Sequence, residues 1–218
     1  MLDQVIVIKN IQGRANDQVV VEYSQENAIG KPDKIRFPAE TALKYSIRRQ
    51  LVLTESDWEI IKTEAIGLQA KIKAFALVAQ RERTAFELTK ALKSTKRFTF
   101  TDQMIEVAVA RVEELGYLDQ DKIAHHHVTR SASTLKSKRL LRHQMKGRGI
   151  SDSAIETSLD NYDEMPAALM HTQKQCKVID LNSPSPGQLD QVKQHLYRKG
   201  FQTATIELCL QTLTKSNF

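Results

Sequence analysis

The spacing of apolar residues along the chain changes at Pro38. Before it, apolar residues gather in short β-branched runs, "VIVIKNI" from Val5, "VVVEY" from Val19 and "IRF" from Ile35. The stretches between these runs, "QGRAND" and "GKPD", are rich in residues that favour tight turns. Short runs that alternate with turns are typical of antiparallel strands. The pattern therefore predicts two or three strands of a small antiparallel unit.

After Pro38 the apolar residues recur at helical spacing. "PAETALKYSI" predicts a short helix with proline in its first turn. "TESDWEIIKTEAI" predicts a second helix, with Thr54 as N-cap and Trp58 facing the core. "LQAKIKAFALVAQ", which follows Gly67, predicts a further helix.

Capping residues predict where the next helices begin and end. Thr84 stands three residues before Glu87, which is the spacing of a capping box. A later helix is expected to begin after Thr101 and to end at Gly116, since glycine readily takes the left-handed conformation that follows a helix. Asp119 then caps a helix that carries three consecutive histidines.

The three histidines, 125–127, do not have the spacing of a metal site. On a helix, adjacent side chains point about 100° apart, whereas two ligands on one face stand three or four residues apart. A calcium loop that begins at Asp119 fails as well, because its sixth and twelfth places hold Ala124 and Arg130 instead of glycine and glutamate. We expect neither a metal nor a cofactor.

The second half of the chain contains an internal repeat. Six positions recur at a constant offset of 51 residues. The first set is Leu141, Met145, Gly149, Ile150, Ile155 and Leu159, and the second is Val192, Leu196, Gly200, Phe201, Ile206 and Leu210. A looser upstream copy comprises Leu88, Leu92, Phe100, Ile105 and Val109. Self-similarity at a fixed period is the signature of a helical array.

The predicted fold class is therefore mainly α. A small antiparallel β-containing region with short helices occupies residues 1–66. Three three-helix repeats follow in a curved array, at residues 67–116, 117–162 and 163–218.

Composition favours an anionic partner and a reducing compartment. Lysine and arginine number 32 against 26 aspartates and glutamates, which gives a formal net charge of +6. The two cysteines lack the spacing of a disulfide framework. The N-terminal apolar run is too short for a signal or membrane-spanning helix. We expect a cytoplasmic protein that does not enter the membrane and is a monomer.

The basic residues are strongly segregated along the chain. No acidic residue occurs between Lys122 and Ser151, whereas five acids and no basic residue occur between Asp152 and Glu164. If residues 135–146 are helical, the basic side chains share an arc of about 100° beside the apolar face. A further basic cluster stands upstream and includes Lys90, Lys93, Lys96 and Arg97.

The simpler interpretation is that lysine and arginine only keep the helices soluble. Clusters at similar places in three repeats favour an anionic partner instead. The candidate DNA- or partner-binding residues are Arg81, Arg83, Arg130, Lys136, Lys138, Arg139, Arg142, Lys146, Arg148, Lys193, Arg198 and Lys199.

Motifs of common enzymes are missing from the sequence. It contains no G-x-x-x-x-G-K-[ST], no G-x-G-x-x-G and no G-x-S-x-G. Its carboxylate pairs, such as Glu113 with Glu114, are adjacent and diverge on a helix. We expect no catalysis.

Three stretches, "RERTAFELTKAL", "VEELGYLDQDKIA" and "LLRHQMKGRGISDSAIETSL", resemble in order and spacing the RecX family of RecA regulators. The resemblance covers about residues 68–213. Gln120 and Ile123 depart from it, at places where the family usually has aspartate and an aromatic residue. The resemblance implies a tandem helical-repeat regulator that binds in the groove of RecA filaments on single- and double-stranded DNA and restrains recombinase and coprotease activity in DNA repair and the SOS response.

Two other functions remain open at this stage. One is a helical-repeat scaffold that binds an acidic protein partner without DNA. The other is a helix-turn-helix transcription factor, which is disfavoured because no short-turn helix pair ends in a recognition helix bearing arginine, asparagine and glutamine.

Overall fold

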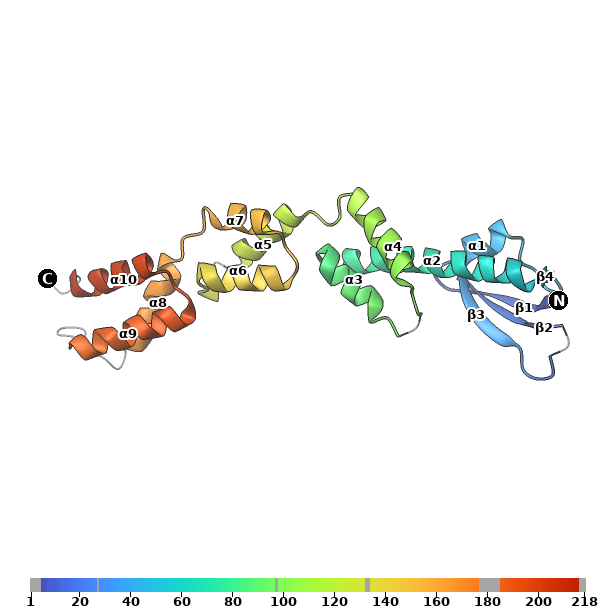
Figure 1. The fold of residues 1–218 in the computed structure, drawn as a ribbon, viewed down its shortest axis with the longest axis horizontal. Helices are drawn as coiled ribbons and strands as arrows, with labels where there is room; N and C mark the ends of the chain where they lie inside the picture. Colours follow the sequence, from blue (N-terminus) through green and yellow to red (C-terminus); the bar gives the residue numbers. More distant parts are fainter. Residues whose placement is uncertain (1–4, 27, 97, 132–133, 177–184, 216–218) are drawn as a thin grey trace. The chain divides into compact units, whose positions relative to one another are not determined.

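The chain forms two compact units. The first comprises Met1–Arg81 and Leu88–Tyr117, and the second comprises Glu82–Glu87 and Leu118–Phe218. The computed structural model describes residues 5–26, 28–96, 98–131, 134–176 and 185–215. Figure 1 shows the described helices and strands in chain order, and each unit is considered by itself.

The first unit begins with a four-stranded antiparallel sheet. Its strands are β1 (Val5–Arg14), β2 (Gln18–Gln25), β3 (Asp33–Pro38) and β4 (Val52–Thr54), in the order β3-β2-β1-β4. Asn16 and Asp17 have positive φ of 61° and 51° and form the first turn, whereas Gly13 pairs with Val19 inside the ladder. The expected antiparallel unit is confirmed, and β4, only three residues long, is an addition.

Two helices pack on this sheet, α1 (Ala39–Lys44) and α2 (Glu55–Gln80). Trp58 of α2 is buried between Tyr23 and Phe37, with ring centroids 4.7 and 5.6 Å away. Complete burial of one large apolar side chain stabilises a fold by about 1.5–3 kcal/mol. The core position predicted for Trp58 is confirmed.

The two helices predicted on either side of Gly67 are a single helix in the structure. That prediction was wrong, because a lone glycine weakens a helix by only about 1 kcal/mol and ends it only where a cap follows. Tertiary packing offsets this cost, since Ala65 and Ala70 are both buried and Gly67 faces Met104 of α4. Helix α2 thus runs through the position proposed for the boundary between 1–66 and 67–116.

The predicted helix limits farther along are confirmed. In α3 (Ala85–Lys93), Thr84 Oγ1 accepts from the Glu87 amide at 3.1 Å, and the Glu87 carboxylate accepts from the Thr84 amide at 3.2 Å. Helix α4 (Asp102–Glu114) is capped by Thr101, and Gly116 follows it with φ of 77°. In the first unit α4 packs against α2.

Six helices of the second unit form two triplets. The first triplet is α5 (Gln120–Ser131), α6 (Lys138–Gly147) and α7 (Asp152–Leu159). The second is α8 (Met165–Cys176), α9 (Pro186–Lys199) and α10 (Thr203–Lys215). Each has its own apolar core, and the repeated apolar positions lie in these cores. The predicted fold class, mainly helical with a small antiparallel N-terminal sheet, is confirmed.

Candidate nucleic-acid interface

The second unit contains two equivalent contacts, which we call joints. In each, a hydroxyl side chain just before a helix donates to a backbone carbonyl that precedes a glycine. In one, Ser137, the N-cap of α6, donates its hydroxyl to the carbonyl of Lys199 at 2.8 Å. In the other, Thr84 donates its hydroxyl to the carbonyl of Arg148. Each acceptor directly precedes a glycine with positive φ, Gly200 at 87° or Gly149 at 76°.

The residue two places after each hydroxyl covers the glycine. A methyl group built on Gly149 would lie 2.5 Å from Cβ of Phe86, and one built on Gly200 would lie 3.0 Å from Nε of Arg139. The position held by the apolar Phe86 in the joint at Gly149 is therefore held by a cation, Arg139, in the joint at Gly200.

The joints also differ in how their remaining cations are paired. At the first, the Arg148 guanidinium donates to both oxygens of Glu87, at 3.1 and 3.2 Å. At the second, Leu140 stands at the place of Glu87. Four cations gather there, and none of their side chains makes an ion pair with any residue that the structure describes. We call Lys138, Arg139, Arg198 and Lys199 the α6–α9 basic patch.

Two of these cations occupy a position that disfavours them. Lys138 and Arg139 lie in the first turn of α6, which contains no acidic residue. The N-terminus of a helix carries partial positive charge, so cations there destabilise the helix unless a counter-charge is near. Glu164 supplies one by accepting from the Lys138 amide at 2.7 Å.

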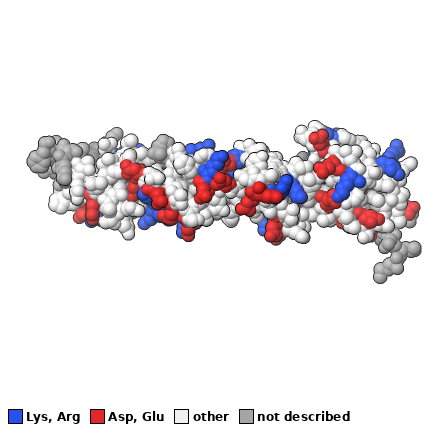
Figure 2. Space-filling model, turned by 90° about the horizontal axis from the view of Figure 1, so that it is seen from above, with Lys and Arg blue, Asp and Glu red and all other residues white. Residues whose placement is uncertain are grey.

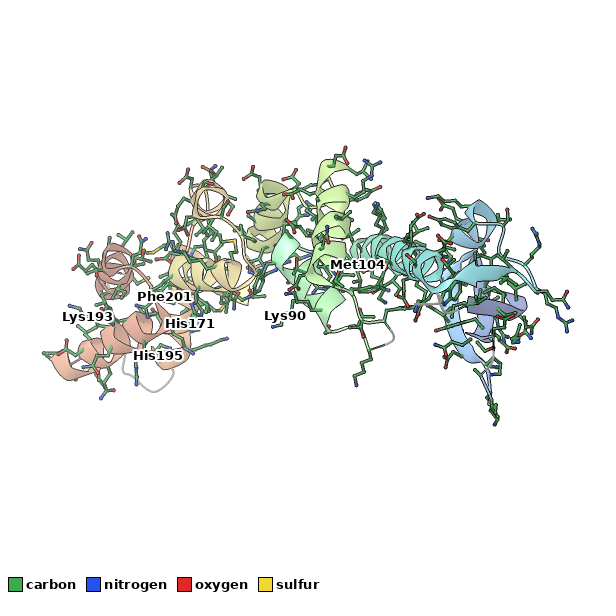
Figure 3. The ribbon with its side chains drawn as sticks, turned by 45° about the vertical axis from the view of Figure 1, so that its right-hand side comes forward. Lys90, Met104, His171, Lys193, His195 and Phe201 are labelled. Carbon is green, nitrogen blue, oxygen red and sulfur yellow. The ribbon has the colours of Figure 1, made fainter. Side chains whose placement is uncertain are left out.

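Two packed histidines lie beside the patch. His195 of α9 packs beside His171 of α8, with ring centroids 5.9 Å apart, and Phe201 lies 5.6 Å from His171 (Figure 3). The pKa of His195 lies below its ordinary value, first because burial disfavours the charged ring, and then because Lys199, His171 and Arg198 repel a further positive charge.

Other predicted site residues are neutralised by the acids that follow them in sequence. Arg142 donates to both oxygens of Glu156 at 2.7 and 2.8 Å, and Lys146 lies 2.8 Å from Asp152. The basic and acidic residues that are separated along the sequence therefore lie close together in space between α6 and α7. On the face shown in Figure 2, acidic and basic side chains are interspersed.

The remaining candidates lie apart from the patch or already have partners. Arg81, Arg83 and Arg130 each have an interaction within the structure, and Lys136 donates to the Gln144 side chain at 3.0 Å. Lys193 is exposed on α9, about one turn before Arg198. Arg97 lies outside the described residues.

The histidine triplet has three different environments on α5. His125 is exposed, His126 lies 2.6 Å from a Glu82 carboxylate oxygen, and His127 Nδ1 lies 3.4 Å from the Arg148 guanidinium. Within the described ranges, no group of three or more histidine, cysteine, aspartate or glutamate side chains could hold a metal ion.

We predict that His127 makes stability depend on pH. Its pKa lies below the ordinary value, first because of burial and then because Arg148 is close. The unfolded chain therefore binds this proton more readily than the folded chain. Stability is fully present above about pH 6.5 and is lost as pH falls through that value toward the lower folded pKa. Urea denaturation of H127Q should show a flatter decline between about pH 7 and 5.5.

The control for this prediction is H125Q, which changes an exposed residue of the same triplet. It should leave the pH dependence as steep as in the unaltered protein. An unchanged decline in H127Q would assign the pH dependence to other groups.

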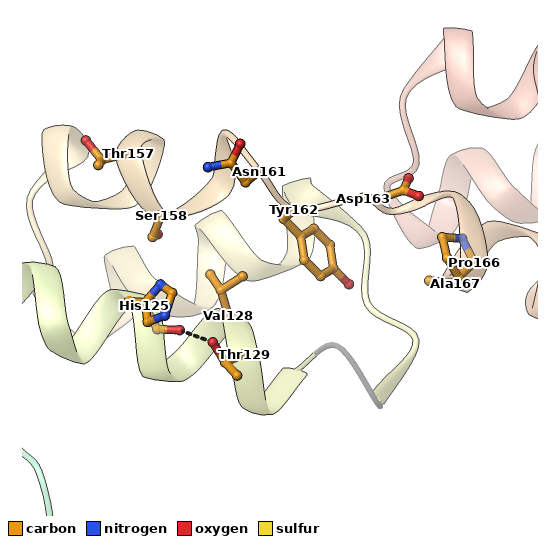
Figure 4. A pocket seen from close by; sticks show the side chains of 10 residues that line it. All are labelled: His125, Val128, Thr129, Thr157, Ser158, Asn161, Tyr162, Asp163, Pro166 and Ala167. Atoms are coloured by element: carbon orange, nitrogen blue, oxygen red, sulfur yellow. Dashed lines mark hydrogen bonds between the residues drawn. The ribbon is translucent and has the colours of Figure 1, made fainter.

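A cavity of about 420 Å³ lies beside α5 and α7 (Figure 4). Two of its polar side chains have structural partners: Thr129 donates to the carbonyl of His125 at 2.9 Å, and Tyr162 donates to the carbonyl of Lys136 at 2.7 Å. No cation of the α6–α9 basic patch lines it. The cavity therefore has the chemistry of a packing gap. None of the described helices has an apolar stretch long enough to cross a membrane.

The fold and this surface define a class of protein: a helical-repeat protein with an N-terminal sheet and a basic interface. No family model matches the chain. Relatives named regulatory protein RecX do match it. Those from Caldanaerobacter subterraneus and Geobacillus thermodenitrificans are both 24% identical, over 79% and 88% of this chain and 84% and 70% of theirs. One from Streptococcus pneumoniae is 22% identical over 83% of this chain and 69% of its own.

Solved structures agree on the fold. The crystal structure of a regulatory protein RecX matches with a TM-score of 0.69 and 19% identity, over 94% of this chain and 98% of that one. RecX from Lactobacillus salivarius matches with a TM-score of 0.60 and 18% identity, over 68% and 96%. The resemblance to the RecX family is therefore confirmed over most of the chain.

Proposed function

We propose that this protein is a non-enzymatic regulator of the RecA recombinase that binds RecA–DNA filaments and restrains their activity. The matches to proteins named RecX support the recombinase as target. The observation that carries the DNA contact is the α6–α9 basic patch. None of its side chains makes an ion pair among the described residues, unlike those of Arg142, Lys146 and Arg148.

The geometry of the patch suits phosphate rather than base edges. Its cations come from the start of one helix and the end of another, and Arg139 packs over the backbone at Gly200. Such a surface presents charge along a backbone but does not place a helix into a groove for readout. Binding should therefore depend little on sequence.

We predict that neutralising the patch weakens both DNA binding and recombinase inhibition. In K138Q/R139Q, two phosphate contacts are lost, so the slope of log affinity against log salt should fall by about 1.4 to 1.8. The ATPase of RecA on single-stranded DNA should be inhibited less at each concentration of the variant. Stability should not fall, because two cations leave a helix N-terminus.

Two control variants carry the same loss of charge. R142Q/K146Q changes α6 at cations already paired with Glu156 and Asp152, and K9Q/K31Q changes exposed lysines of the first unit. Both should retain most of the inhibition. Equal loss in all three variants would show that only net charge matters. If binding to RecA weakens with salt but free DNA does not compete for it, the partner of the patch is an acidic protein surface.

A further inference from the structure

The two helices on either side of each repeat loop form equivalent pairs, α3/α4, α6/α7 and α9/α10. A groove lies between α3 and α4, and another lies between α9 and α10. Alignment of the repeats by their buried apolar residues matches five positions in each. These are Thr89, Lys93, Asp102, Ile105 and Glu106 in the first, Arg142, Lys146, Asp152, Ile155 and Glu156 in the second, and Lys193, Tyr197, Thr203, Ile206 and Glu207 in the third.

Ion pairs join the two helices in the first two pairs. Lys93 lies 2.8 Å from Asp102, the first residue of α4, and Lys146 lies 2.8 Å from Asp152, the first residue of α7. Between α6 and α7, Arg142 adds a bidentate pair with Glu156. The cations there are already neutralised by the opposite helix.

The α9/α10 groove lacks this crossing pair. Tyr197 replaces the lysine, and Thr203, the first residue of α10, replaces the aspartate. The groove has a volume of about 590 Å³, against about 430 Å³ for the α3/α4 groove. Its lining residues are Asp190, Lys193, Gln194, Tyr197, Arg198, Thr203 and Ile206.

The walls of this groove combine an aromatic ring with two cations. Tyr197 is 61% exposed, and no ring contact or hydrogen bond of its side chain occurs among the described residues. Lys193 stands one turn before it on the same helix, and Arg198 is the next residue. Neither makes an ion pair within the described part of the chain. Figure 3 labels Lys193 on α9.

The N-terminus of α10 is not free to attract an anionic ligand. The Glu164 carboxylate already accepts from the Gln202 amide and the Thr205 hydroxyl, both at 3.0 Å. Negative charge therefore stands at the start of α10. The groove lining itself carries one carboxylate, Asp190, against the two cations Lys193 and Arg198, so its net charge favours an anionic ligand.

We propose that the α9/α10 groove binds a nucleotide unit of single-stranded nucleic acid. The base stacks on Tyr197, and Lys193 and Arg198 hold the adjacent phosphates. An exposed aromatic face between cations is the combination by which proteins bind single strands without sequence preference. An acidic peptide would use the cations but leave the ring without a partner. The proposal rests on the proposed DNA contact and extends it from phosphate to base.

The test compares two fluorescently labelled oligonucleotides with the same number of phosphates, oligothymidine and an abasic strand. Fluorescence anisotropy should show that Y197A weakens oligothymidine binding at least about fivefold, since one stacked base contributes that much or more. Binding of the abasic strand should change less than about twofold, and Y197F, which keeps the ring, should bind as the unaltered protein does.

A second variant closes the groove without changing net charge. Y197K/T203D introduces the ion pair that joins α3 to α4 and α6 to α7, and it should lose the preference for oligothymidine over the abasic strand. Because Tyr197 and Thr203 are exposed, the thermal unfolding of Y197A and of Y197K/T203D should match that of the unaltered protein.

Several outcomes would overturn the proposal. One is equal binding of oligothymidine by Y197A and the unaltered protein, and another is equal loss of both strands. Displacement of oligothymidine by oligoglutamate with no effect of Y197A would assign the groove to an acidic peptide. The proposed function is tested separately, because K138Q/R139Q leaves this groove intact. If that variant loses RecA inhibition while Y197A binds normally, only the nucleotide site fails.

Discussion

Replacement of Gly149 by alanine should lower the free energy of unfolding by about 2–5 kcal/mol. Its φ of 76° costs a residue with a side chain about 1–2 kcal/mol. In addition, the new Cβ would lie 2.5 Å from Cβ of Phe86, which is close to the backbone and cannot swing away. Such overpacking typically costs a further 1–3 kcal/mol. Urea denaturation of G149A at neutral pH measures the sum.

Two other glycines separate the conformational cost of G149A from its overpacking cost. Gly116 has φ of 77° but open space around its Cβ position, so G116A should show only the conformational cost. Gly147 is the last residue of α6, also with open space around its Cβ position, and G147A should be neutral or stabilise by up to about 1 kcal/mol. Equal costs for G149A and G116A would mean that Phe86 yields and that the joint is looser than its geometry indicates.

The elements that the sequence predicted well are those specified by neighbouring residues. Thr84, Thr101 and Asp119 each accept from an amide three residues ahead, and this signal is contained in four residues of sequence. The continuity of α2 through Gly67 was missed because tertiary packing offsets the cost of the glycine, and packing partners such as Met104 are distant in sequence. Strand β4 was missed because a strand of three residues carries no period.

The candidate surface was predictable only in part for a similar reason. The basic character of α6 and α9 is visible in the sequence, but the pairing of Arg142 with Glu156 requires that α6 and α7 lie side by side. Only the ion pairs of the folded chain show which cations are left without one. Tyr197 escaped notice because exposed aromatics are common, although the repeat alignment places it where Lys146 stands and could have singled it out.

Glu164 connects the patch to the stability of the fold, and E164Q should cost about 2–4 kcal/mol. Its side chain is buried, and the residue as a whole is 3% exposed. One oxygen accepts from the Lys138 amide, and the other accepts from the Gln202 amide and the Thr205 hydroxyl. Hydrogen bonds to a charged group contribute about 1.5–3 kcal/mol each, and a buried donor left unsatisfied costs about 1–3 kcal/mol.

Glutamine has nearly the shape of glutamate, so E164Q isolates the hydrogen bonding. Its carbonyl can serve one side, but its NH₂ group then faces a donor on the other, at the start of either α6 or α10. D160N removes the same charge at an exposed residue nearby and should change stability by less than about 0.5 kcal/mol. Chemical denaturation of E164Q and D160N measures the difference in their free energies of unfolding. If E164Q is no less stable than D160N, Glu164 does not tie these two helix ends together, and another group must compensate the cations at the start of α6.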